Sequence, residues 1–88
     1  MATARLTDIM HSGDLFIFQT RHGNWVLGAA SEVNDNGDIS CPARHADTGF
    51  ESMFFTTLKQ ALAAADAMGL IRTWKIGYHR WKLEKKAA

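Results

Sequence analysis

The sequence predicts a small α+β domain, in which an antiparallel sheet of three to four strands carries one α-helix packed across it, in the order β-β-β-α-β. Aromatic and β-branched runs separated by turn residues occupy positions 14–55. One helical repeat of apolar residues follows over 57–68, and apolar and basic residues alternate after residue 70. A chain of 88 residues is ordinarily one domain. We therefore expect a single domain over 1–88, with an N-terminal segment over 1–12 and a frayed tail over 84–88.

The first two strands are predicted over 14–20 and 24–33, where Phe, Ile, Val and Trp are frequent. His22-Gly23 between them is typical of a two-residue hairpin loop. Because alternate residues of a strand point to the same face, that loop predicts one shared core face. Its facing pairs would be Thr20 with Trp25, Phe18 with Leu27, and Phe16 with Ala29.

A second turn is predicted at Asn34-Asp35-Asn36-Gly37, because Asn-Gly readily adopts two positive φ angles. A short third strand over 38–41 would follow and end at Pro42, with a loop over 42–49 and an extended segment over 50–55. An edge such as 38–41 can pair with its symmetry mate, so the sequence also predicts a homodimer.

The helix is predicted over 57–68. Thr57 and Gln60 match a capping box, in which each side chain satisfies a backbone amide of the first turn. Gly69 is typical of a helix end. The apolar stripe consists of Leu58, Ala61, Leu62 and Ala65. Its alanines indicate a close approach of the helix to the sheet. The two leucines are expected to be the main side chains packed against the sheet.

The C-terminal stretch fits two periodicities. Trp74, Ile76 and Tyr78 alternate with Lys75 and Gly77, as in a strand, whereas Ile71, Trp74, Tyr78 and Trp81 also fall at helical spacing. Gly77 and the β-branched residues favour the strand. The alternation slips near His79-Arg80, which predicts a β-bulge there.

The order of elements has a general likeness to the small sheet-plus-helix modules typified by the arm-binding domains of tyrosine integrases. In those modules a three-stranded sheet lies in the DNA groove and a helix covers its back. The likeness spans roughly residues 14–69 and rests on Trp25, the Asn36-Gly37 turn and the junction at Phe55-Thr56-Thr57. The integrase modules carry basic residues along their strands, whereas residues 14–41 contain only Arg21 against four acidic residues. No family is assigned on this likeness.

Charge is distributed unevenly along the chain. Residues 1–71 hold four basic and eight acidic side chains, a net of −4, whereas residues 72–88 hold six basic and one acidic, a net of +5. Aromatic residues interleave with these cations, a pattern typical of sites where bases stack and phosphates are neutralised. The predicted nucleic-acid-binding residues are Arg72, Trp74, Lys75, Tyr78, Arg80, Trp81 and Lys82. The alternative is that the aromatic side chains belong to the core and the cations form the solvated face of the last strand.

Catalytic and metal chemistry find little support in the sequence. Cys41 and His45 are four residues apart, but a structural zinc site needs such ligands twice over, and a catalytic thiolate needs a third, orienting group. One cysteine forms no internal disulfide. We find no phosphate-binding glycine loop and no hydrolase or metalloprotease motif. The sequence thus predicts neither enzyme activity nor a cofactor nor a metal.

The leading expectation is a small non-catalytic binding module that associates with nucleic acid through its basic, aromatic C-terminal segment. The alternative is a protein-binding inhibitor or adaptor, of a phage or mobile-element accessory type, which docks on a larger complex through features such as the acidic stretch 32–51. An enzyme is the third alternative. No apolar run approaches the roughly 20 residues of a membrane helix, and residues 1–13 lack a signal-like stretch, so we expect a cytoplasmic protein without a membrane partner.

Overall fold

A computed structural model describes residues 10–33, 39–77 and 79–86. The strands are β1 (Leu15–Gln19), β2 (Trp25–Ala29), β3 (Glu32–Val33), β4 (Ile39–Ser40), β5 (Met53–Phe55), β6 (Leu70–Gly77) and β7 (Arg80–Lys85), and the helix is α2 (Leu58–Ala67). Five strands form one antiparallel sheet in the order β5-β2-β1-β7-β6, while β3 and β4 form a separate two-stranded ribbon. The α+β class is confirmed, but the main sheet has more strands than predicted and a different order.

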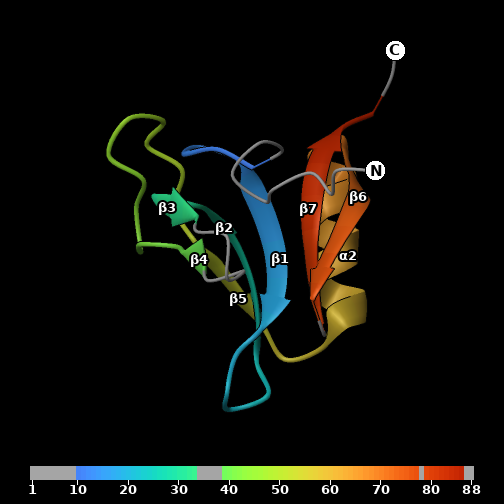
Figure 1. Ribbon diagram of the computed structural model, residues 1–88. Coiled ribbons are helices and arrows are strands. Elements are labelled where there is room, and N and C mark those ends of the chain that lie inside the picture. The colour runs from blue at the N-terminus through green and yellow to red at the C-terminus, as the bar shows by residue number, and fades with distance from the viewer. Residues whose placement is uncertain (1–9, 34–38, 78, 87–88) are drawn as a thin grey trace, which may run out of the picture.

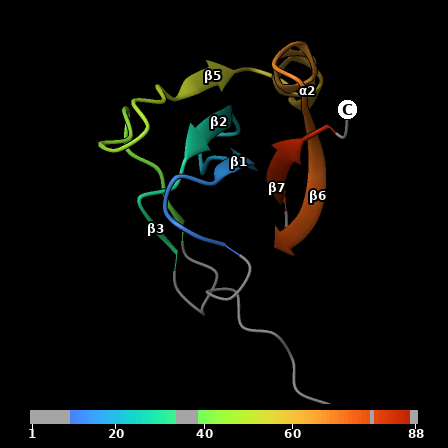
Figure 2. The same ribbon diagram turned by 90° about the horizontal axis from the view of Figure 1, so that it is seen from above.

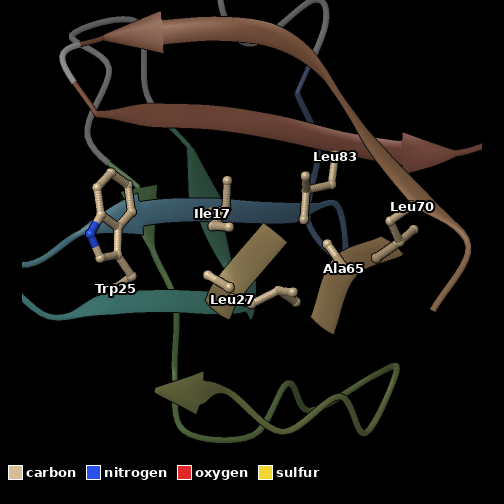
Figure 3. Packing of buried hydrophobic residues seen from close by; sticks show 7 residues of the cluster. Ile17, Trp25, Leu27, Ala65, Leu70 and Leu83 are labelled. Atoms are coloured by element: carbon tan, nitrogen blue, oxygen red, sulfur yellow. The ribbon is translucent and has the colours of Figure 1, made fainter. Parts of the chain in front are cut away.

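The sheet is curved, and α2 lies between its two edge strands, β5 and β6 (Figure 2). The helix contacts β2, β5 and β6. On the face that the helix covers, Ile17 and Leu27 pack with Ala61 and Ala65, and Leu83 and Leu70 extend the same cluster toward β6 (Figure 3). The ribbon of β3 and β4 lies beside β1 and β2, away from the helix (Figure 1). Phe16, Met10 and Ala30 form a second buried cluster on that side, with Ile39 of β4 packed against it.

The first hairpin corrects the predicted register by one residue. Phe18 pairs with Val26 and Ile17 with Leu27, so Phe16 and Phe18 face away from the helix while Leu27 faces it. The reason is the loop. Thr20 donates its backbone N–H to the carbonyl of Asn24, which leaves three loop residues instead of two, and Gly23 takes the positive φ of 88° that such a loop requires. One additional loop residue exchanges the faces of a whole strand.

The helix matches its prediction closely. Thr57 is the N-cap, and both halves of the capping box with Gln60 are formed. Gly69 follows the C-cap with a φ of 76°, as a helix end of this type favours. The prediction that the leucines are the main packing residues is wrong. Ala61 and Ala65 are the fully buried residues of the stripe, and Leu58 and Leu62 are half-buried at its sides. The close approach of helix and sheet thus depends on the alanines.

The C-terminal stretch forms strands, as predicted, but two of them. The expected bulge at His79-Arg80 is instead the turn of a hairpin between β6 and β7, where His79 has a φ of 57°. Pairing continues with register shifts between Arg72 and Trp74 and between Lys75 and Gly77. Of the tail expected to fray, Glu84 and Lys85 lie in β7, and the backbone N–H of Lys86 donates to the carbonyl of Gly69.

The predicted third strand is present only as β4, and it pairs with β3 instead of joining the main sheet. The edge strands of that sheet are β5 and β6, so the edge expected at 38–41 is not one of them. The Asn36-Gly37 turn lies outside the described residues. Within the described part of the chain, no helix is long and apolar enough to cross a membrane.

Candidate functional site

The predicted nucleic-acid-binding residues do not share one surface. Trp81 pairs with Ile17 on the helix-covered face of the sheet, and Arg72 and Lys75 lie opposite Leu83 and Trp81, which places both cations on that face. The opposite face carries Lys82, across from Phe16, together with Arg80 and Trp74. Tyr78 lies outside the described residues. The alternation of aromatic and basic residues in the sequence thus becomes a division between two faces.

On the helix-covered face, five side chains form what we call the cationic tryptophan cluster: Trp25, Arg72, Lys75, His79 and Trp81. The rings of Trp25 and Trp81 stack with centroids 6.1 Å apart and an interplanar angle of 25°. His79 meets Trp25 edge-on, with centroids 5.5 Å apart. The guanidinium carbon of Arg72 lies 5.0 Å from the Trp81 ring centroid, and Nζ of Lys75 lies 5.8 Å from it.

The cluster presents cations held over an aromatic support. Arg72 and Lys75 are exposed, and no described acidic side chain forms an ion pair with either of them. Each cation–π contact contributes about 0.5–1 kcal/mol at an exposed site, and it orders the long side chain as well. Trp81 is half-buried, stacks on Trp25 and is contacted by both cations. Its ring therefore supports the two cations and is not an open platform for a base.

The opposite face differs in its electrostatics. The side chain of Lys82 is only 13% exposed, and its Nζ lies 3.4 Å from both Asp14 Oδ2 and Glu84 Oε1. Lys86 likewise pairs with Asp66. Lys82 is thus a structural ion-pair partner that links β7 to the start of β1. Trp74, on the same face, is 50% exposed and is the one predicted aromatic that the described structure leaves open to a partner.

Sequence reasoning missed two members of the cluster. Trp25 was predicted as a core residue of the first hairpin, and His79 was predicted only as part of a bulge. Trp25 reaches Trp81 because β2, β1 and β7 are consecutive in the sheet. His79 reaches Trp25 because the backbone N–H of Gln19 in β1 donates to the carbonyl of His79. No spacing in the sequence signals this arrangement, since 56 positions separate the two stacked tryptophans.

Cys41 packs against the second buried cluster, and His45 is buried in a hydrogen-bonded loop. His45 is 3% exposed, and its Nδ1 accepts backbone N–H groups from Asp47 at 3.2 Å and Thr48 at 3.1 Å. The ring proton is therefore on Nε2, which lies 3.0 Å from Ser12 Oγ. Burial raises the pKa of the Cys41 thiol to about 11, which keeps it protonated at neutral pH. The described residues contain no group of three side chains that could hold a metal ion.

Substitution of His45 by alanine is expected to destabilise the fold by about 1–3 kcal/mol, because two backbone N–H groups and the Ser12 hydroxyl lose their partner. His22→Ala is the matched control, since His22 is exposed in the hairpin loop and should change stability by less than about 0.5 kcal/mol. Urea denaturation followed by circular dichroism measures both. Equal midpoints for the two variants would contradict the structural role of His45.

Comparison with known protein families, with curated proteins and with solved structures finds no match to this chain. The function is therefore inferred from the side chains themselves. Two features of the β6–β7 hairpin indicate a binding surface: the exposed cations of the tryptophan cluster on one face, and the exposed Trp74 on the other.

Proposed function

We propose that the protein is a non-catalytic binding module that associates with nucleic acid through the β6–β7 hairpin. The observation that carries the proposal is that Arg72 and Lys75 lie exposed over Trp81, with no acidic partner among the described residues. Lys85 is exposed on the same face, opposite Leu70. Cations without ion pairs are the ones that neutralise phosphates at the lowest cost, because no existing pair has to be broken.

The proposed interface is smaller than the predicted one. Arg72, Lys75 and Lys85 would contact phosphates, whereas Lys82 is held by two carboxylates and Trp81 supports the cluster from below. Trp74 lies on the other face of the same edge strand, β6, so a ligand at this edge can contact both faces. The exposed Trp74 ring would stack on an unpaired base. Because stacking on Trp74 requires an unpaired base, the proposed ligand is single-stranded nucleic acid and not a duplex. Because few phosphates would be contacted, we expect a modest affinity.

The proposal is tested with the double substitution Arg72→Glu and Lys75→Glu, titrated against a fluorescent single-stranded oligonucleotide at several salt concentrations. Two lost phosphate contacts should flatten the slope of log affinity against log salt by about 1.4. The matched control is Arg21→Glu with Lys59→Glu, which makes the same change in net charge at exposed positions outside the hairpin. Circular dichroism establishes that both variants fold.

An equal loss of affinity in both double variants would show that only net charge matters and that the hairpin is no interface. Absence of salt-dependent binding by the wild-type protein at low ionic strength would contradict the nucleic-acid proposal altogether. Lys82 is a poor choice for this test, because its side chain is largely buried and pairs with two carboxylates that link β7 to the start of β1. Lys86 is a poor choice because its charge is already paired with Asp66.

A second candidate is a protein-binding inhibitor or adaptor that docks on a larger complex. The observation in its favour is that all five residues from Ile71 to Lys75 are exposed, including two large apolar side chains. Exposed apolar residues at a sheet edge are typical of protein interaction sites. Affinity capture with and without nuclease separates the two candidates, because only a nucleic-acid-mediated association is lost on digestion.

A further inference from the structure

Strand β6 is an edge strand with one side unpaired. Among the described strands it pairs with β7 alone, and the described backbone hydrogen bonds outside the strand pairs include none to Leu70–Gly77. The helix packs near the start of β6, where Leu70 is buried, and leaves Ile71–Lys75 exposed. An edge of this kind offers a row of N–H and C=O groups to which another extended segment can add.

The two faces of β6 differ in chemistry. Arg72 and Lys75 lie on the helix-covered face, opposite Leu83 and Trp81. Ile71 and Trp74 lie opposite Glu84 and Lys82, on the other face, and both are exposed. The register shift at Thr73 makes this possible, because it returns Trp74 to the face of Ile71 three positions earlier. An added strand would therefore meet positive charge on one side and apolar surface on the other.

We infer that β6 accepts an extended segment of a protein partner whose side chains alternate between acidic and apolar residues. The acidic residues would lie beside Arg72 and Lys75, and the apolar residues would cover Ile71 and Trp74. Charge complementarity favours an acidic partner strand over a second copy of the chain. A second copy would place two further cations beside Arg72 and Lys75, and such repulsion between like charges is known to protect edge strands from self-association. The inference rests on the protein-partner candidate and uses the unpaired edge, which the nucleic-acid proposal does not need.

The probe is a capped ten-residue peptide in which Glu and Val alternate, titrated into the full chain labelled with ¹⁵N. We expect amide shifts confined to β6 and its neighbours, and slowed amide exchange along β6. Two control peptides have the same length: one groups the same residues into a Glu block and a Val block, and one replaces each Glu by Lys. Both control peptides should bind more weakly than the alternating peptide. Neither can place acidic residues beside Arg72 and Lys75 and, at the same time, valines over Ile71 and Trp74.

Two protein variants test the contacts. Ile71→Thr with Trp74→Thr keeps strand-compatible residues but removes the apolar surface, and it should weaken peptide binding on the order of tenfold. Phe54→Thr is the matched control, since Phe54 is a 69% exposed apolar residue on the other edge strand, β5. It should leave peptide binding unchanged.

Three results would overturn the inference: no amide shifts in β6, equal binding of the block or lysine peptide, or a loss of binding in Phe54→Thr instead of the β6 variant. Concentration-dependent sedimentation of the protein alone, abolished by Ile71→Thr with Trp74→Thr, would identify a second copy as the occupant and would also overturn it. Oligonucleotide titration distinguishes this failure from that of the nucleic-acid proposal. Ile71→Thr alone should weaken peptide binding and leave oligonucleotide affinity unchanged, because Ile71 carries no charge and no aromatic ring.

Discussion

Trp25→Ala is expected to cost about 3–5 kcal/mol of folding free energy, the usual range for truncation of a buried aromatic residue to alanine. Trp25 is 6% exposed, stacks on Trp81 and meets His79 edge-on. A domain of this length has a total stability of about 4–13 kcal/mol, so the variant should lie close to its unfolding transition at room temperature. Urea denaturation monitored by far-ultraviolet circular dichroism measures the loss without dependence on tryptophan emission.

Trp74→Ala is the control for this prediction, because the side chain is 50% exposed on the other face of the sheet. We expect a change below about 0.5 kcal/mol, as for surface substitutions in general. Trp25→Phe, which preserves an aromatic ring, should fall between the two and gives a measurable value if the alanine variant does not fold. Similar losses for Trp25→Ala and Trp74→Ala would contradict the division of the aromatic residues between core and surface.

Gly28→Val is expected to destabilise the protein by about 2–3 kcal/mol, although strands ordinarily favour valine over glycine. Gly28 lies in the fully buried strand β2, and a Cβ at this position would be 2.7 Å from Ser52 Oγ and 3.4 Å from Cys41 Cβ. Ser52 Oγ cannot rotate away without cost, because it donates a hydrogen bond to the carbonyl of Pro42 at 2.9 Å. Thermal denaturation should therefore show a lower melting temperature.

A double-substitution cycle tests the cause of this loss. Ser52→Gly removes the clashing atom, so Gly28→Val should cost less in that background than in the wild type, with a coupling energy of about 0.5–3 kcal/mol. Additive effects of the two substitutions would show that the approach of the 41–52 segment to β2 is not what limits the side chain at position 28. An increase in stability from Gly28→Val alone would contradict the packing of this segment.

Elements that depend on neighbours in the chain were predicted well. The helix has its expected N-cap, capping box and terminal glycine, because each of these is set by residues within four positions of one another. Strand formation in the C-terminal stretch also followed from local preference for β-branched residues. The first hairpin shows the limit of local prediction, since one additional loop residue decided which face Phe16 and Phe18 occupy.

In the candidate site, too, the features that depend on nearby residues were predicted, and those that depend on distant contacts were not. Net charge identified the C-terminal segment as basic, and Arg72 and Lys75 of that segment are exposed. The ion pairs of Lys82 and the stacking of Trp81 could not be predicted, because their partners Asp14 and Trp25 lie more than fifty residues away in the sequence. Contacts of that separation depend on strand order, which no local pattern encodes here.

By itself, the sequence determined that this chain combines an antiparallel sheet with a helix of defined ends, and that its positive charge gathers after residue 71. Only the tertiary structure decided that β7 inserts between β1 and β6, which packs Trp81 against the core and leaves Trp74 on an exposed edge. The physical reason is that caps, turns and charge act over a few residues. By contrast, the burial of a side chain depends on which distant strand pairs beside it.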